Sequence, residues 1–121
     1  MRVLLDESVP HQLRAALGHH DAQTVVYAGF AGYKNGHLLK AAEDSGFDVL
    51  LTADKTLQFE QNMAGRKLAL VCMSANSWKI IKPKTRDIVR AVDAVKPGSL
   101  TLVDCGAFTR RKVKPGGPIP G

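Results

Sequence analysis

The chain has 121 residues, of which 45% are hydrophobic and 23% charged, a balance typical of one globular domain with a single core. No apolar run approaches the roughly 18 residues that a membrane span requires, and the first residues lack the basic region and apolar segment of a secretory signal. We therefore expect a cytoplasmic protein without a membrane partner, in which Cys72 and Cys105 form no disulfide.

The net charge of +6 is concentrated near the C-terminal end of the sequence. Residues 109–121 contain four basic side chains and no acid, so the rest of the chain carries a charge of only +2. We accordingly divide the chain into a domain at 1–104 and a basic, Pro- and Gly-rich tail at 105–121, which we expect to be disordered. The tail either attracts phosphates without specificity or serves only solubility.

Five short apolar or β-branched runs predict strands. In chain order they cover 2–5, 24–27, 49–52, 68–73 and 100–103. The runs at 2–5 and 68–73 are apolar without alternation, which is typical of strands buried on both faces of a parallel sheet.

Helical spacing of apolar residues predicts helices between these strands. Ser8 suits the N-cap of a first helix that ends at Gly18, and Asn35 suits the N-cap of a second helix that runs to about Ser45. A short helical turn at 55–62 and a helix that begins near Thr85 complete the series. Strands alternating with helices indicate an α/β fold, a three-layer α/β/α sandwich with a mostly parallel central sheet.

Acidic residues follow two of the predicted strands. Asp6 and Glu7 follow the run at 2–5, and Asp54 follows the run at 49–52. If these strands are parallel neighbours, their carboxyl ends meet at one edge, where facing carboxylates bind a hard cation such as Mg²⁺ or Mn²⁺. The alternative is that each acid caps the helix or turn that follows it.

Further polar residues are expected at the same edge of the sheet. His37 lies in the first turn of the helix that precedes 49–52, and it is either a surface histidine or a ligand or proton shuttle. Asn76 and Ser77 follow the run at 68–73 and either contact phosphate or belong to an ordinary loop. Lys79 lies beside Trp78 in a basic stretch of a kind that holds a nucleic-acid backbone.

The remaining histidines show no metal-ligand spacing along the sequence. His19 and His20 are adjacent in a predicted loop, and Asp93 falls on the exposed side of the last predicted helix.

Three blocks of sequence resemble the small bacterial PIN-like proteins, relatives of the VapC toxin ribonucleases of toxin–antitoxin pairs. The blocks are Leu-Leu-Asp-Glu-Ser-Val-Pro at 4–10, Gly-Tyr-Lys-Asn-Gly-His-Leu-Leu at 32–39 and Val-Leu-Leu-Thr-Ala-Asp-Lys-Thr-Leu-Gln-Phe-Glu-Gln-Asn at 49–62. The resemblance runs from residue 1 to about residue 103 and implies a nuclease that uses Mg²⁺ or Mn²⁺ to hydrolyse RNA.

The resemblance also implies roles for individual residues. Asp6, Glu7 and Asp54 map to the catalytic acids, and Asp6 and Asp54, with His37 as a further candidate, map to the metal ligands. The substrate-binding candidates are Thr52, Lys55, Asn35, Asn76, Ser77 and Lys79.

Two acids that the resemblance leads us to expect are replaced in this chain. Where the family has an acid near the start of the second helix, this chain has Asn35, Gly36 and His37. Where the family has an acid two residues beyond Asp54, this chain has Thr56. The sequence therefore leaves two hypotheses: a metal-dependent ribonuclease, with an antitoxin protein or a second copy of the chain as partner, or a degenerate PIN-like domain that binds RNA or protein without catalysis. A phosphate-handling receiver-like domain is disfavoured because Asp104, not a lysine, follows the last strand.

Overall fold

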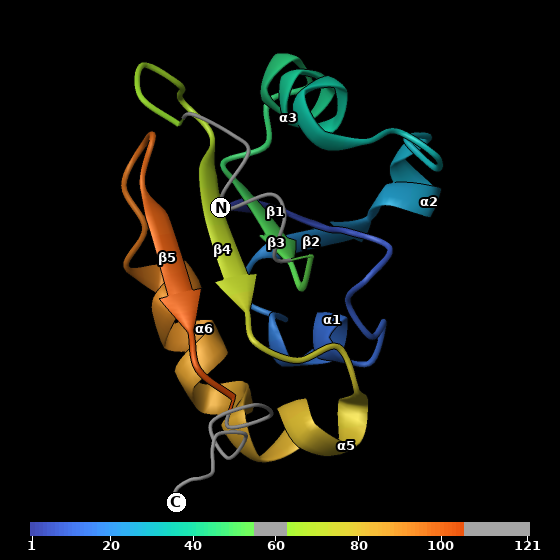
Figure 1. The fold of residues 1–121 in the computed structure, drawn as a ribbon, viewed down its shortest axis with the longest axis vertical. Coiled ribbons are helices and arrows are strands. Elements are labelled where there is room, and N and C mark those ends of the chain that lie inside the picture. Colours follow the sequence, from blue (N-terminus) through green and yellow to red (C-terminus); the bar gives the residue numbers. More distant parts are fainter. Residues whose placement is uncertain (55–62, 106–121) are drawn as a thin grey trace, which may run out of the picture.

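The computed structural model describes residues 1–54 and 63–105 and folds them around one parallel sheet (Figure 1). The described strands are β1 (Arg2–Leu5), β2 (Asp21–Thr24), β3 (Val49–Thr52), β4 (Ala69–Met73) and β5 (Leu100–Val103). Their spatial order is β2-β1-β3-β4-β5, and every neighbouring pair is parallel. The predicted α/β class with a parallel sheet is confirmed.

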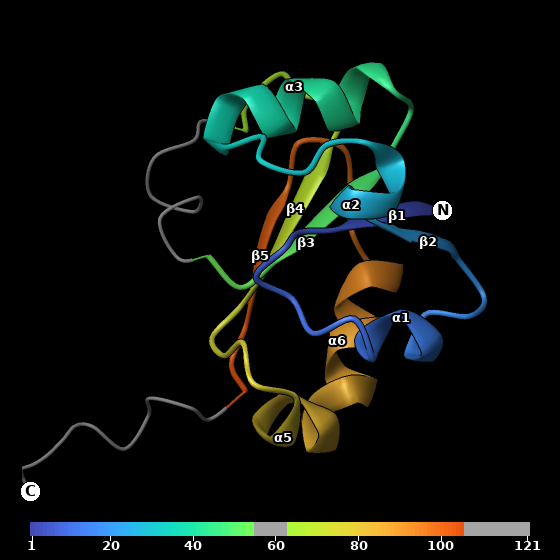
Figure 2. The same ribbon diagram turned by 90° about the vertical axis from the view of Figure 1, so that its right-hand side faces the viewer.

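Helices cover both faces of this sheet (Figure 2). On one face lie α2 (Val25–Ala28) and α3 (Asn35–Asp44), and on the other lie α1 (Leu13–Ala16), α5 (Trp78–Ile81) and α6 (Thr85–Asp93), with the 3₁₀ helix η1 (Lys82–Lys84) joining α5 to α6. None of the helices in the described part is long and apolar enough to cross a bilayer.

Strand side chains alternate between two hydrophobic clusters, one on each face of the sheet. Leu4, Leu50 and Leu70 pack with α3 residues such as Leu39. On the opposite face, the core residues from the strands and from α1, α5 and α6 include Val3, Leu5, Val49, Leu51, Val71, Leu13, Ile81, Ile88 and Val92. The strands β3 and β4 are buried along their whole length, which explains why every residue in them except Thr52 is apolar.

The second predicted strand is wrong in its position. The strand β2 ends at Thr24, and the residues from Val25 to Ala28 form the helix α2 instead. The Thr24 hydroxyl accepts a hydrogen bond from the Tyr27 backbone N–H at 3.2 Å, and Gly29 ends the helix in the left-handed region at φ 88°. The cap and the glycine together override the β propensity of this run.

Two predicted helix caps are also corrected. The helix α1 begins at Leu13 behind Gln12, so Ser8 does not cap it, and α3 has Lys34 at its N-cap position and Asn35 as its first residue. The helix α5 was not predicted from sequence. The turn expected at 55–62 and the tail from 106 onward lie outside the described residues, whereas Cys105 belongs to the core and is 4% exposed.

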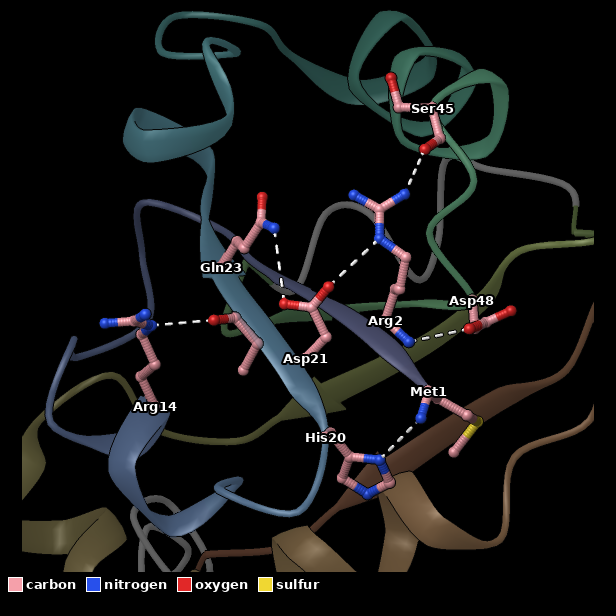
Figure 3. A network of polar contacts seen from close by, with 9 residues as sticks. Met1, Arg2, Arg14, His20, Asp21, Gln23, Ser45 and Asp48 are labelled. Carbon is pink, nitrogen blue, oxygen red and sulfur yellow. Dashed lines mark hydrogen bonds and ion pairs between the residues drawn. The ribbon is translucent and has the colours of Figure 1, made fainter.

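At the amino-terminal edge of the sheet, one arginine, Arg2, links several elements (Figure 3). The Arg2 backbone N–H donates to Asp48 Oδ2 at 2.8 Å, and its guanidinium pairs with Asp21 and donates to the Ser45 carbonyl. The same guanidinium carbon lies 4.2 Å from the centre of the Phe47 ring, a cation–π contact. Arg2 therefore links the start of β1 to the start of β2 and to the connection between α3 and β3.

A second link to this edge comes from Glu43 on α3. Its carboxylate accepts hydrogen bonds from the backbone N–H groups of Lys67 and Leu68, just before β4, and pairs with Arg66 at 3.3 Å. The hydrogen bond from Lys67 is the main cause that holds the pKa of the Glu43 carboxyl below its ordinary value.

We expect the hydrogen bonds of Glu43 to make the free energy of unfolding depend on pH in the acidic range. The Glu43 pKa is lowered in the folded state, so its contribution is fully present above the ordinary value of 4.5 and is lost as the pH falls below that value. Urea unfolding of Glu43→Gln across this range should show lower stability at neutral pH and a smaller loss on acidification. Asp44→Asn, which changes an exposed neighbour whose ion pair within the described residues is with Lys40, is the control; Asp44 has only the smallest effect on the Glu43 pKa, so this variant should stay close to the parental pH dependence. An unchanged acid profile in Glu43→Gln would contradict the role of this carboxylate.

Candidate functional site

The strands that carry the candidate acids are direct neighbours. Leu5 pairs with Leu51 in a parallel register, and the Asp6 backbone N–H donates to the Leu51 carbonyl at 3.0 Å. The expectation that Asp6 and Asp54 emerge at the same edge of the sheet follows directly from this pairing.

This edge is also the topological switch point of the sheet. In the order β2-β1-β3-β4-β5 the chain turns back from β2 and continues on the other side of β1 with β3. Crossover connections leave β1 and β3 in opposite directions, so a crevice opens beyond their carboxyl ends, and ligands of open α/β sheets bind there.

A pocket of about 280 Å³ lies at this position. Three carboxylate residues line it, Asp6, Glu7 and Asp54. The other lining residues are Ser8, Tyr33, Lys34 and Leu38. The helix α3 runs back along the sheet before β3, so the residues at its start reach the same edge as the ends of the strands.

The Asp6 carboxylate is fixed by two hydroxyl groups. Thr52 Oγ1 donates to Asp6 Oδ2 at 2.8 Å, and Ser8 Oγ donates to the same oxygen at 2.9 Å. Each hydroxyl in turn accepts a backbone hydrogen bond at 3.0 Å, Thr52 from the Asp54 N–H and Ser8 from the Ala53 N–H. The ends of β1 and β3 are thus joined through side chains as well as through the backbone.

Thr52 holds this network from inside the protein. It is 0% exposed, so its side chain has no surface with which to touch RNA, and its role is to position Asp6. The two residues after the strand, Ala53 and Asp54, are partly buried, and the Asp54 backbone is bonded directly to Thr52. Within the described residues, no hydrogen bond reaches Asp6 Oδ1.

Glu7 is held from another side of the pocket. Its Oε1 accepts a hydrogen bond from the Gly32 backbone N–H at 3.2 Å. Gly32 has φ 85°, a conformation that side chains disfavour, so the glycine allows its N–H to be presented here. Glu7 therefore fixes the loop before α3 and does not cap α1.

The donor set suits a hard divalent cation by type. Carboxylate and hydroxyl oxygens are the ligands of Mg²⁺ and Mn²⁺. Asp6, Glu7 and Asp54 are, however, not a tight triad: in the described part of the chain they do not all bring a carboxylate oxygen within 4.8 Å of one another. Residues so arranged fit an ion that keeps several of its waters and takes one or two carboxylates from the protein.

The other predicted site residues lie around the pocket or away from it. His37 is exposed and stacks on Tyr33, with ring centres 4.1 Å apart, but it does not line the pocket. Asn76, Ser77 and Lys79 are exposed beyond the end of β4, next to β3, and none of them lines the pocket. Lys55 lies outside the described residues, and of Asn35 only the backbone is described.

Sequence reasoning did not assign four of the lining residues to the site: Ser8, which it expected only as a helix cap, and Tyr33, Lys34 and Leu38. Tyr33 stacks between the rings of Phe30, at 5.4 Å, and His37, and Lys34 is exposed at the N-cap of α3. The signal was available, because the start of a helix that precedes a parallel strand faces the carboxyl edge of that sheet.

The interpretation of the histidines needs a correction. Two of them, His19 and His20, lie with Asp93 in a group whose ligand atoms are all within 4.8 Å of one another, the one such group of three in 1–54 and 63–105. Asp93 is 73 residues away from His20 in sequence, so no local spacing could reveal this group.

Comparisons of the chain with family models, with curated proteins and with solved structures gave no match. The resemblance to PIN-like proteins therefore stays a prediction from the three sequence blocks.

We expect Thr52→Val to destabilise the fold by about 1–3 kcal/mol, because it removes a buried hydroxyl that donates to Asp6 Oδ2 and accepts from the Asp54 N–H. Urea unfolding measures this difference. Thr101→Val is the matched control, since Thr101 also lies in a strand and has no side-chain hydrogen bond to a described residue. Equal stability of the two variants would show that the Thr52 hydroxyl does not support the strand ends.

Proposed function

We propose that this protein is a metal-dependent ribonuclease whose site is the pocket between the carboxyl ends of β1 and β3. The observation that carries the proposal is the meeting of Asp6, Glu7 and Asp54 in one pocket at the switch point of a parallel sheet. Carboxylates that line the same pocket attract a divalent cation. The PIN-like resemblance, which rests on sequence alone, adds RNA as the substrate class.

Asp6 and Asp54 are the residues that would hold Mg²⁺ or Mn²⁺ in this proposal. When bound, the ion would supply Lewis-acid polarisation of the phosphodiester and a more acidic water. The Thr52 and Ser8 hydroxyls orient Asp6 by engaging Oδ2, so that the carboxylate is held in one position before any ligand arrives. Glu7 serves as the third acid and also holds the loop at Gly32.

Lys34 and Tyr33 are the substrate-binding residues that we add. The Lys34 ammonium lies in the pocket lining, where it offsets the acids and attracts a phosphate. The Tyr33 ring stacks between Phe30 and the exposed His37, and an unpaired base of single-stranded RNA would stack on the His37 end of this row of rings.

A second candidate function is RNA binding without hydrolysis. It is favoured by the wide spacing of the three acids, which fall short of a tight three-ligand group, and by the two hydroxyl groups that already engage Asp6 Oδ2. In this case the carboxylates would act in the fold, and Tyr33 and Lys34 would carry the interaction with RNA.

The expected protein partner and the cytoplasmic location stay predictions. An antitoxin or a second copy of the chain would need an apolar surface, and the largest exposed apolar side chains in the described part include Tyr27 at 78%, Val26 at 64% and Leu102 at 61%.

We expect Asp54→Asn to reduce RNA cleavage by more than about 100-fold, beyond the loss caused by removing an outer-shell partner of a metal. The measurement is cleavage of a fluorogenic single-stranded RNA in Mg²⁺ and in Mn²⁺. Asp44→Asn removes an exposed acid at the other end of α3 and should cleave like the parent. If Asp54→Asn cleaves at the parental rate, the proposed mechanism fails.

Ion binding can be tested separately from cleavage. A bound ion raises the melting temperature by mass action, so saturating Mg²⁺ should stabilise the parent and not Asp6→Asn. If Mg²⁺ leaves the parent unchanged while RNA still binds, and Lys34→Ala weakens that binding, the noncatalytic function is supported and the ribonuclease is excluded.

A further inference from the structure

The group formed by His19, His20 and Asp93 lies at the end of the sheet opposite to the acidic pocket. The two histidines lie in the loop between α1 and β2, immediately before β2 begins at Asp21. Asp93 is the last residue of α6, which precedes β5. Because every strand is parallel, residues that precede strands and residues that follow them lie at opposite edges. The group is therefore separate from the proposed ribonuclease site.

Three ligand atoms converge in this group. His19 Nε2 lies 2.9 Å and His20 Nε2 lies 2.6 Å from the same Asp93 oxygen, Oδ1. Around an ion with bonds of about 2.0–2.1 Å, adjacent ligand atoms are about 3.0–3.4 Å apart. The two distances to Asp93 Oδ1 are a few tenths of an ångström shorter than this spacing, and all three ligand atoms lie within 4.8 Å of one another, so small side-chain movements would admit an ion.

The side chains are both anchored and accessible. The side chain of His20 is 7% exposed, and its Nδ1 lies 3.1 Å from the Met1 amino nitrogen, which fixes the plane of the ring (Figure 3). The side chains of His19 and Asp93 are 54% and 47% exposed, so water can complete the coordination of an ion.

The end of α6 adds negative charge at this position, against the positive charge of the Met1 amino group beside His20. Asp93 ends the nine-residue helix α6, and the carbonyl end of a helix carries partial negative charge. One carboxylate and two imidazoles select a borderline transition ion, because imidazole nitrogen suits Zn²⁺, Ni²⁺ and Cu²⁺ and is a poor ligand for Mg²⁺.

We propose that His19, His20 and Asp93 form a binding site for Zn²⁺ or a similar divalent transition ion, which joins the α1–β2 loop to the end of α6. The three protein ligands leave positions for water. The ion closes a chain segment of 73 residues between His20 and Asp93 and so stabilises the packing of α1 against α6.

The decisive experiment is a titration of the full chain with Zn²⁺, followed by NMR of the histidine rings. The chain has four histidines, so the spectrum reports which of them bind. We expect one equivalent of Zn²⁺ to shift the ring signals of His19 and His20 and to leave those of His11 and His37 in place. Equal shifts of all four rings, or of His11 or His37 alone, would overturn the proposal.

Calorimetry with variants tests the ligands one at a time. His19→Ala removes an exposed side chain and should weaken Zn²⁺ binding by at least about tenfold, as should Asp93→Asn, while His37→Ala should bind like the parent. Parental affinity in His19→Ala excludes the site.

A crossed comparison separates this site from the ribonuclease proposal. Asp6→Asn should abolish stabilisation by Mg²⁺ and keep binding of Zn²⁺. His19→Ala should weaken binding of Zn²⁺ and keep stabilisation by Mg²⁺. Loss of Zn²⁺ binding in Asp6→Asn would mean that the ion sits in the acidic pocket, and the proposal would then be wrong.

Discussion

The pairing of β1 with β3 is the contact on which the rest of this structure depends. It places the first strand of the chain in the interior of the sheet, between β2 and β3, and it joins segments more than 40 residues apart in sequence. At the amino-terminal edge the pairing is fixed by Arg2, and at the carboxyl edge by the hydrogen bonds from Thr52 and Ser8 to Asp6. A shift in register would break the polar contacts at both edges together, so these contacts specify the register that the apolar pattern of the strands leaves open.

The strands were predictable from sequence where burial and propensity agree. The bounds of β1, β3 and β5 match the predicted runs, because a short apolar run between turn residues has few other ways to become buried. The run at 24–27 failed because Val25, Val26 and Tyr27 favour strands by propensity, whereas the Thr24 cap and the positive φ of Gly29 select a helical turn. Local hydrogen bonds determine the helical conformation of this segment, and these bonds cannot be inferred from the hydrophobicity pattern.

The location of the candidate site at the edge of the sheet was predictable from sequence, but its hydrogen-bond network was not. Parallel topology alone places Asp6, Glu7 and Asp54 at one edge, and the sequence supplies that topology through its alternating strands and helices. The sharing of Asp6 Oδ2 by two hydroxyls depends on the register between β1 and β3, which sequence does not reveal. The same limit explains His19, His20 and Asp93, whose meeting requires the end of α6 to lie beside the loop that follows α1.

The hydroxyl groups around Asp6 have two opposing effects on its carboxylate. By donating to Oδ2 they orient the carboxylate and relieve the cost of its partial burial, but they also withdraw electron density from an oxygen that an ion would otherwise use. Oδ1 receives no hydrogen bond from the described residues, so a ligand approaching Asp6 finds one oxygen engaged in the fold and the other available. In the proposed function, a carboxylate engaged in this way would bind an ion through a single oxygen, with water as the other ligands, a coordination that Mg²⁺ accepts. The reduced set of acids and the hydroxyl network are therefore compatible with the proposed site, in which a single-oxygen contact from Asp6 would be complemented by Asp54 as the second anionic ligand.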